Sequence, residues 1–278
     1  MAVFLSLLTA ALFGTGDFLG GLAGRRVRVL QVLAVSHLVG LVGITIAAIF
    51  LADEFIAVDL VWGALAGSSG FVGLGLLYRG LARGPMGVVA PLTAITSAAV
   101  PAAWGVLVDD DVLSGGAWLG VGFALAAIAL VSWAPTGGQS VTTMVVLEAL
   151  LAGAGFGFMF VVLDQTDPAS APWSIVGGRL LTGGALLLFF LIRREPIVPP
   201  DQTSRRLLVG LGGFDTGSNA LFLYAADAGS LTIAAVLSSL YPVSTVVLAR
   251  LVLKEHLTRG QQLGFVAALV GAALIAVG

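Results

Sequence analysis

Residues 234–257 read AAVLSSLYPVSTVVLARLVLKEHL, which is a long apolar segment with one proline that closes in a short charged turn. An earlier segment follows the same plan, since residues 89–113 read VAPLTAITSAAVPAAWGVLVDDDVL. A run of about 20 apolar residues is long enough to cross the hydrocarbon core of a bilayer as a helix. Each segment is followed by another apolar run, so the pattern indicates a membrane-spanning chain that is built twice.

The composition points the same way. Of the 278 residues, 58% are hydrophobic and 10% are charged, which is far from the average of soluble domains. The net charge of -2 is too small to indicate a nucleic-acid partner. The chain has no cysteine and only two widely separated histidines, which excludes disulfides and thiolate chemistry. We therefore expect no metal site and no cofactor.

We expect an all-α membrane protein with ten transmembrane helices, because open sheet edges cannot lie in lipid. Residues 3–22 lack a basic leader region and contain Asp17, so this stretch is interpreted as the first span and not as a cleaved signal peptide. Many of the 38 glycines fall inside spans and predict close helix packing. The spans cover roughly residues 2–23, 30–51, 60–80, 87–108, 115–134, 144–163, 172–192, 207–226, 231–253 and 261–277.

Charged residues separate to the two sides of a chain threaded through ten spans. The positive-inside rule places the basic loops in the cytoplasm and both termini outside the cytoplasmic membrane. The basic side contains Arg25, Arg26, Arg28, Arg79, Arg83, Arg193, Arg194, Arg205, Arg206, Lys254 and Arg259. The other side has no Lys or Arg in its loops and contains Asp53, Glu54, Asp59, Asp109, Asp110, Asp111, Asp164, Asp167 and Asp227.

Internal matches divide the chain into two repeats, residues 1–139 and residues 140–278. Three dipeptides recur 144 residues later: Leu119-Gly120, Ala124-Leu125 and Ala129-Leu130 return as Leu263-Gly264, Ala268-Leu269 and Ala273-Leu274. Each half has five spans, an odd number, so the second half enters the membrane in the opposite sense. Inverted five-helix repeats of this kind are typical of secondary transporters, which expose a site at the repeat interface to each side in turn.

Several motifs resemble those of EamA-type transporters of the drug/metabolite transporter superfamily. They are GPMGVVAPL at residues 84–92, LSSLYP at residues 237–242 and LKEHLT at residues 253–258, the last being similar to the Gly-Glu-Arg-Leu turn of the family. GDFLGG at residues 16–21 resembles a bacterial subgroup, whereas DDDVL at residues 109–113 departs from the family turn. The external termini also differ from the usual picture of the family. The resemblance covers essentially the whole chain. It implies gradient-driven export or exchange of small polar metabolites, amino acids or drugs.

Ionisable residues inside the spans are candidates for substrate binding or ion coupling, because a charge is costly in the membrane. Asp17 is a candidate for a proton-titrating or cation-binding carboxylate, and its structural alternative is a pair with Arg25 or His37. Asp215 lies near the middle of the eighth span, and Asn219 follows one turn later on the same helix face. These two side chains either line one wall of the site or form hydrogen bonds between helices.

Two further side chains are candidates in the second and seventh spans. Arg179 is expected either to neutralise Asp215 or to hold a substrate carboxylate, for which a guanidinium fork is suited. His37 is a candidate proton relay, with a packed, hydrogen-bonded histidine as the alternative.

Pro91 and Tyr241-Pro242 fall inside expected spans of the two halves. A proline removes a backbone hydrogen bond and kinks a helix, which frees carbonyls that can face a cavity. The expectation at Tyr241 is a gate or substrate-facing break, and the alternative is an inert packed kink. Glu148 and Arg250 are expected to reach the cytoplasmic interface and are given no role.

Secondary active transport by alternating access is the leading function. The expected partners are the lipid bilayer, a small polar metabolite or amino-acid-like substrate, and a proton or another cation. An enzyme is not expected, because no His-x-x-x-His, Gly-x-Ser-x-Gly or paired-carboxylate arrangement appears. A passive channel is disfavoured because no wide polar stripe is present. A lipid-linked-sugar flippase stays open as the alternative.

Overall fold

The computed structural model describes residues 1–108, 114–133, 141–227, 237–238 and 240–277. In these residues the chain forms ten α-helices and one short 3-10 helix. They are α1 (Ala2–Gly24), α2 (Val29–Leu51), α3 (Ala57–Arg83), α4 (Met86–Val108), α5 (Gly115–Trp133), α6 (Thr143–Leu163), η1 (Pro168–Ser170), α7 (Ala171–Arg193), α8 (Gln202–Asp227), α10 (Tyr241–Val252) and α11 (Arg259–Val277).

The helices lie close to the expected spans, with two kinds of difference. α3 and α8 are longer than expected, at 27 and 26 residues, because their polar ends continue as helix beyond the apolar run. The expected ninth span, residues 231–253, lies partly outside the described residues, and its longest described part is α10.

Six helices in the described part of the chain are long and apolar enough to cross a membrane, namely α1, α2, α3, α4, α6 and α7. α8 is not among them, because Asp215, Asn219 and several small polar residues lower the hydropathy of its central part. The six helices make the chain a multi-pass membrane protein.

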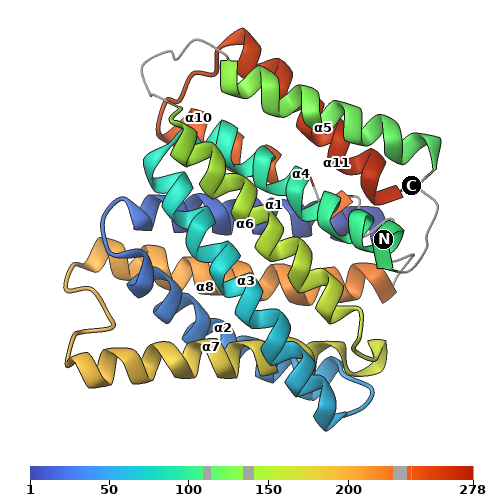
Figure 1. The fold of residues 1–278 in the computed structure, drawn as a ribbon. Helices are drawn as coiled ribbons and strands as arrows, with labels where there is room; N and C mark the ends of the chain where they lie inside the picture. Colours follow the sequence, from blue (N-terminus) through green and yellow to red (C-terminus); the bar gives the residue numbers. More distant parts are fainter. Residues whose placement is uncertain (109–113, 134–140, 228–236, 239, 278) are drawn as a thin grey trace.

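Helices of residues 1–139 pack mainly against helices of residues 140–278. α3 contacts both α6 and α7, α1 contacts α8 and α10, and α2 contacts α7 and α8 (Figure 1). α4 lies against α6 and α11, while α5 pairs with α11 at the upper edge of the view. The interface between the two halves therefore runs through the whole described bundle.

The closest helix crossings depend on glycine. A Cβ atom on Gly63 of α3 would overlap the backbone carbonyl oxygen of Ser174 in α7. In the same way, a Cβ atom on Gly14 of α1 would overlap the carbonyl oxygen of Tyr241 in α10. Small residues allow such approaches where no hydrophobic effect drives helices together. These glycines thus set the distances between α3 and α7 and between α1 and α10.

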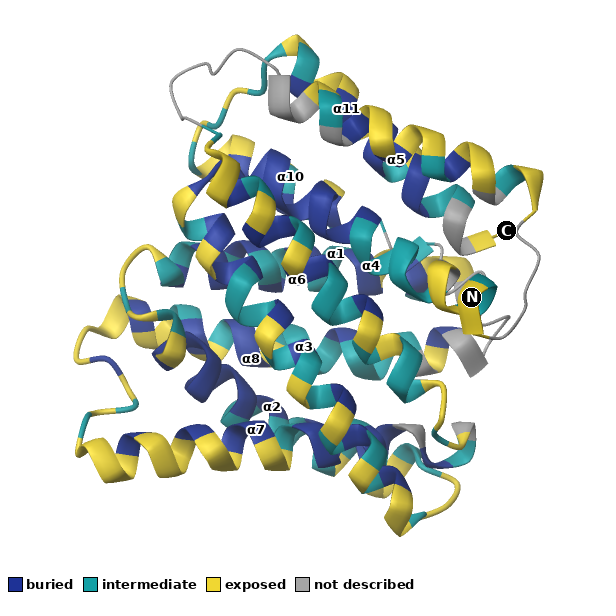
Figure 2. Ribbon diagram, in the orientation of Figure 1, coloured by how far each residue is buried: buried dark blue, intermediate teal, exposed yellow. Residues whose placement is uncertain are grey.

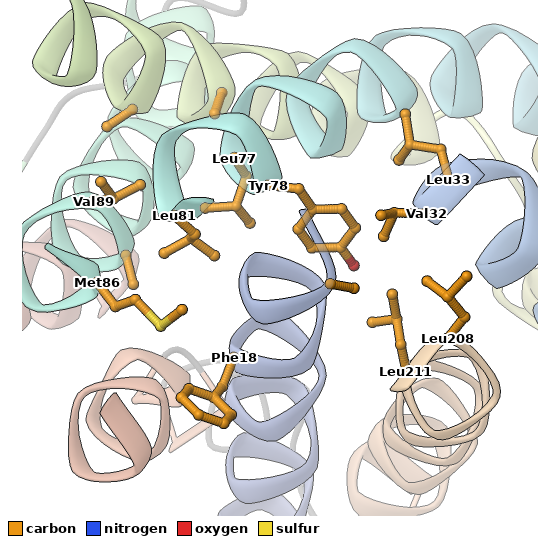
Figure 3. Close-up of a cluster of buried hydrophobic side chains, with 14 of the residues drawn as sticks. Phe18, Val32, Leu33, Leu77, Tyr78, Leu81, Met86, Val89, Leu208 and Leu211 are labelled. Atoms are coloured by element: carbon orange, nitrogen blue, oxygen red, sulfur yellow. The ribbon is translucent and has the colours of Figure 1, made fainter. Parts of the chain in front are cut away.

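Buried residues gather where α1, α2, α3, α4 and α8 meet (Figure 2). The cluster includes Tyr78, Val32 and Leu211, which lie together on one side of α1, and Phe18, which points away on the other side (Figure 3). The outer faces of α5, α7 and α11 expose large apolar side chains instead. Apolar outer faces are what lipid-facing helices require.

The basic end of the bundle is held by ion pairs between the two halves. Arg25 pairs with Glu255 at 3.1 Å, and the same glutamate accepts the backbone N–H of Met86 at 2.9 Å. Arg28 pairs with Glu195. In both pairs the arginine belongs to residues 1–139 and the glutamate to residues 140–278, so these bonds connect the loops of the two halves.

Glu148 does not lie at the interface, contrary to the expectation from sequence. It is 2% exposed and pairs with Arg79 and Arg83 of α3, at 2.7 and 3.4 Å. The two arginines are half-exposed and reach the surface with their long side chains. The expectation was wrong because it counted residues along α6 and could not include the arginines that cover Glu148.

At the opposite end, Asp59 is buried in the first turn of α3. It accepts the backbone N–H of Asp167 at 3.1 Å and the hydroxyl of Ser170. The acidic loops are therefore also connected across the two halves, through a carboxylate with hydrogen-bond donors.

Candidate functional site

Asp17 lies on α1 between two glycines that face tyrosines. Gly14 comes three residues earlier and abuts the backbone of Tyr241, and Gly20 comes three residues later and abuts the ring of Tyr78. Residues three apart lie on one face of a helix, so both tyrosines approach the face that carries Asp17. Both also lie within electrostatic reach of its carboxylate. The glycines of α1 thus let α10 and α3 approach closely, one on each side of Asp17 along the helix.

Tyr78 comes from α3 and is only 2% exposed. Its ring lies between α1 and the side chains of Val32 in α2 and Leu211 in α8 (Figure 3). The hydroxyl is also within electrostatic reach of Asp215 and Arg179. A phenol at this position brings one polar group into an otherwise apolar contact and directs it toward the charged residues.

Arg179 and Asp215 form an ion pair between α7 and α8. The Nη2 atom of Arg179 donates to Oδ2 of Asp215, and the two side chains are 12% and 23% exposed. The guanidinium lies directly against Gly40 of α2, which has no side chain to occupy that space. Pairing offsets part of the cost of removing two charges from water. Arg179 therefore takes the first of its two expected roles, the neutralisation of Asp215.

The backbone of Asp215 is also a hydrogen-bond acceptor. Asn219 donates from Nδ2 to the carbonyl oxygen of Asp215 at 2.7 Å, and Ser218 donates from its hydroxyl to the same oxygen at 2.9 Å. The amide of Asn219 thus turns back along its own helix. This arrangement keeps Asn219 one turn from the ion pair.

His37 is buried on α2 and bonds to Thr182 of α7, with 2.7 Å between Nδ1 and Oγ1. Thr182 donates its single hydroxyl proton to the carbonyl oxygen of Gly178 at 2.8 Å. The edge of the imidazole also contacts Phe71, with ring centroids 5.7 Å apart.

The cluster combines two carboxylates with one guanidinium. Asp17 interacts electrostatically with Asp215, which Arg179 already neutralises. Both alternative partners of Asp17 are engaged elsewhere, since Arg25 pairs with Glu255 and His37 bonds to Thr182. Among the residues that the structure describes, Asp17 has no hydrogen-bond or ion-pair partner. With both carboxylates ionised, the cluster carries one uncompensated negative charge.

The two prolines differ from each other. Pro91 lies inside α4, as expected for a kink position. Pro242 lies in the first turn of α10, with Leu240 as the N-cap residue. A proline there needs no backbone partner, since the first N–H groups of a helix are free in any case. The structure therefore has a helix start at Tyr241-Pro242, shortly after the helical residues 237 and 238, and this start faces Gly14 of α1.

The second half of the chain carries the family signature. Residues 143–277 match the model of the EamA-like transporter family. The EamA-like segment supplies Arg179, Asp215, Asn219 and Tyr241, whereas Asp17, His37 and Tyr78 come from the preceding half.

One solved structure, described only as the crystal structure of a protein, has the same fold. It shares 18% identity with this chain at a TM-score of 0.65, and the similarity covers 98% of this chain and 95% of the other. At that identity the likeness concerns the fold alone. A search of curated proteins found no match.

Three residues around the cluster were not singled out by the sequence analysis, namely Tyr78, Gly40 and Thr182. Tyr78 precedes Arg79 at the basic end of its span, where a tyrosine is usually an interfacial anchor. Gly40 and Thr182 are small residues in apolar helices and have no distinguishing pattern. The only available signal was the Gly-x-x-Asp-x-x-Gly spacing around Asp17, which leaves room for neighbours on both sides.

Proposed function

We propose that the chain is a secondary active transporter that exchanges a proton for a small polar metabolite carrying an ammonium group, such as an amino-acid-like molecule. One observation carries this proposal. Asp17 is a carboxylate without a counter-charge among the described residues, next to an Asp215 that is already paired. An ionisable group with this environment inside a membrane protein is a functional candidate by default.

The charge balance defines the exchange. With Arg179 paired to Asp215, the cluster is neutral only when one positive charge neutralises the carboxylate of Asp17. A proton supplies that charge by forming the acid, and an ammonium supplies it by pairing with the carboxylate. Because both use the same oxygens, they compete, and each trip of the site across the membrane carries one or the other. Tyr78 abuts Gly20 and Tyr241 abuts Gly14 on the helix that carries Asp17, so we expect them near the organic part of a ligand at Asp17.

Alternating access follows in this proposal from two inverted five-helix repeats, residues 1–139 and residues 140–278. Equivalent contacts in the two halves support it, if α1, α3 and α4 correspond to α6, α8 and α10. α3 packs on α6, and its counterpart α8 packs on α1. In the same way α4 packs on α6, and its counterpart α10 packs on α1. Thr93 of α4 donates to the carbonyl oxygen of Ala149 in α6 at 3.1 Å, and Thr245 of α10 donates to that of Gly14 in α1 at 3.0 Å. Rocking one repeat against the other would expose the cluster to each side in turn.

The proposed orientation places the basic loops in the cytoplasm, both termini outside and the protein in the cytoplasmic membrane. The proposed direction is export, with protons moving inward as the substrate leaves. Both termini lie toward the same side of the bundle, as two inverted repeats of five helices require (Figure 1).

Transport into proteoliposomes tests the proposal. Vesicles with an acidic lumen are given radiolabelled amino acids and small primary amines, and protein-free vesicles correct for passive accumulation of weak bases. The wild-type protein should accumulate at least one compound only while the pH gradient lasts. Asp17→Asn should abolish the gradient response because it removes the exchanging carboxylate, and Asp215→Asn should abolish it because Arg179, freed from its partner, can then neutralise Asp17. Asp164→Asn, at an exposed turn, is the matched control and should behave as wild type.

Two outcomes would contradict this proposal. If Asp17→Asn accumulated substrate in response to the gradient as wild type does, Asp17 would have no part in the coupling. If the wild-type protein moved its substrate equally with and without a gradient, the protein would be a passive facilitator and not an exchanger.

A further inference from the structure

Gly40 occupies an unusual place on α2, directly under the guanidinium of Arg179. A Cβ atom at this position would overlap the Nη1 atom and would lie 2.8 Å from Cζ and 3.3 Å from Nε. Arg179 extends from α7 and Asp215 from α8, and α2 packs against both helices. The side chain of Arg179 therefore reaches Asp215 by crossing α2 at Gly40, where the absence of a side chain leaves room for the guanidinium.

The kind of neighbour matters as much as its distance. The atoms that Gly40 faces belong to the far end of a flexible side chain, whereas Gly63 faces a backbone carbonyl of α7. A methyl group at position 63 can be accommodated only if the helices separate. At position 40 the guanidinium can move while α2 and α7 stay in place. Substitution of Gly40 should thus disturb the direction of Arg179 and leave the helix packing intact.

A hydrogen bond one turn away fixes the relative position of the two helices. His37 precedes Gly40 by three residues, and Thr182 follows Arg179 by three residues. The His37–Thr182 bond of 2.7 Å is buried, and Thr182 also bonds to the carbonyl oxygen of Gly178 in its own helix. Positions 37 and 40 of α2 therefore lie opposite positions 182 and 179 of α7. One contact holds the helices in register, and the other provides space for the guanidinium.

We infer that Gly40 is a positioning residue that directs Arg179 to Asp215 and thereby leaves Asp17 as the unpaired carboxylate of the cluster. The structural part concerns one contact between positions 40 and 179. Its consequence for proton exchange rests on the proposed function. A guanidinium displaced from Asp215 would be free to approach Asp17, and the two carboxylates would then share the positive charge.

A double-mutant cycle tests this inference. The variants are Gly40→Ala, Arg179→Lys and the two combined, and Gly184→Ala on α7 is the control because a Cβ atom there meets nothing within 4 Å. Lysine keeps the positive charge but lacks Nη1, the atom that the new methyl group would displace. Each purified variant is measured for thermal unfolding in detergent and for gradient-driven uptake of the compound that the wild type accumulates.

Gly40→Ala should lower Tm by roughly 4 °C or more through the disturbed ion pair. It should also reduce gradient-driven uptake about tenfold or more, while Gly184→Ala matches wild type. In the Arg179→Lys background, Gly40→Ala should cause almost no further loss in either measurement. Such non-additivity identifies residues that act through one contact.

Additive losses, or a Gly40→Ala protein identical to wild type, would overturn the inference. The two readouts separate this failure from that of the proposed function. Non-additive Tm values with no gradient-driven uptake by any variant would leave Gly40 as the positioning residue and contradict the exchange. Additive Tm values together with gradient-driven uptake would contradict the role of Gly40 and leave the proposed exchange standing.

Discussion

Asp17 and Asp215 are the same kind of side chain in different surroundings. Asp215 has the guanidinium of Arg179 on its carboxylate and two donors on its backbone carbonyl, whereas Asp17 has tyrosines and glycines. A charge that is already paired gains little from a ligand, but an unpaired one gains a full counter-charge. At the scale of single residues, the proposed exchange therefore rests on Asp17 and its neighbours.

Tyr78 offers a test of those neighbours. Tyr78→Phe keeps the ring that packs against Gly20 and removes only the hydroxyl near Asp17. Gradient-driven uptake should fall about fivefold to tenfold, with a change in Tm of a few degrees at most, because about one hydrogen bond to the substrate is lost. Tyr224→Phe is the control, since Tyr224 is exposed on α8. Equal effects in the two variants would remove Tyr78 from the site.

Part of the site could be predicted at this scale. The depth of Asp17, Asp215 and Arg179 in apolar spans was enough to select them, since charges there are costly. Tyr78, Thr182 and Gly40 could not be selected, because their importance comes from what faces them on other helices. Nothing in the sequence around Gly40 distinguishes it from other glycines of the spans or indicates that Arg179 crosses it. Pair contacts between distant spans have no local sequence signal.

At the scale of helices, the α3–α7 crossing is tightly packed, with the backbones in contact at Gly63 and Ser174. Gly63→Ala should lower Tm by roughly 4 to 10 °C, because the new methyl group meets the backbone of Ser174 and the helices must separate. Gly184→Ala, on the outer side of α7, should leave Tm unchanged or raise it slightly, since alanine is the better helix former. Thermal unfolding of the two purified variants checks this. A similar Tm for both would mean that the crossing is not tightly packed.

The start of α8 gives a prediction for pH. Asp201 accepts the backbone N–H of Ser204 at 2.7 Å, and this bond holds the pKa of the exposed Asp201 carboxyl below its ordinary value of 3.8. A pKa that is lower in the folded state stabilises the fold above the unfolded pKa, and this stabilisation is lost as the pH falls through the folded pKa.

Asp201→Asn keeps a good N-cap acceptor but cannot titrate. The Tm advantage of wild type over Asp201→Asn should therefore shrink as the pH is lowered from about 6 to about 3. Thermal unfolding of both proteins across that range measures the difference. A difference that is constant with pH would show that the charge of Asp201 adds nothing to the cap.

The helices themselves were largely predictable, because long apolar runs are the strongest sequence signal in a membrane protein. The predicted helix bounds are wrong where a polar segment is helical or where an apolar segment contains a helix boundary. The polar ends of α3 and α8 are helical although they add no hydrophobicity. At residues 240–242 the apolar run continues but one helix start is present, which proline in a first turn explains.

At the scale of the molecule, the two halves are joined at both ends. Arg25–Glu255 and Arg28–Glu195 connect them at the basic end, and Asp59 connects them to the loop before α7 at the other. Alternating access would require at least one of these ends to open in each state. Charge segregation could be read from the sequence, but which charges pair across the halves could not, because the partners are up to 230 residues apart.

The proposed orientation can be measured directly, since the chain has no cysteine. Single-cysteine variants Arg26→Cys and Asp164→Cys place a thiol at opposite ends of the bundle, both at exposed positions. In intact cells a membrane-impermeant maleimide should label Asp164→Cys and should label Arg26→Cys only after lysis, because basic loops remain cytoplasmic. The opposite labelling pattern would place the termini inside and contradict the proposed orientation.

The central claim is that one carboxylate, Asp17, exchanges a proton for an ammonium group. Infrared difference spectroscopy of the reconstituted protein tests it most directly, because a protonated carboxyl has a C=O stretching band that a carboxylate lacks. Addition of the transported amine should remove such a band from the wild-type spectrum, and Asp17→Asn should lack the band that changes. A band that persists when substrate binds, or that changes in the same way in Asp17→Asn, would contradict the account.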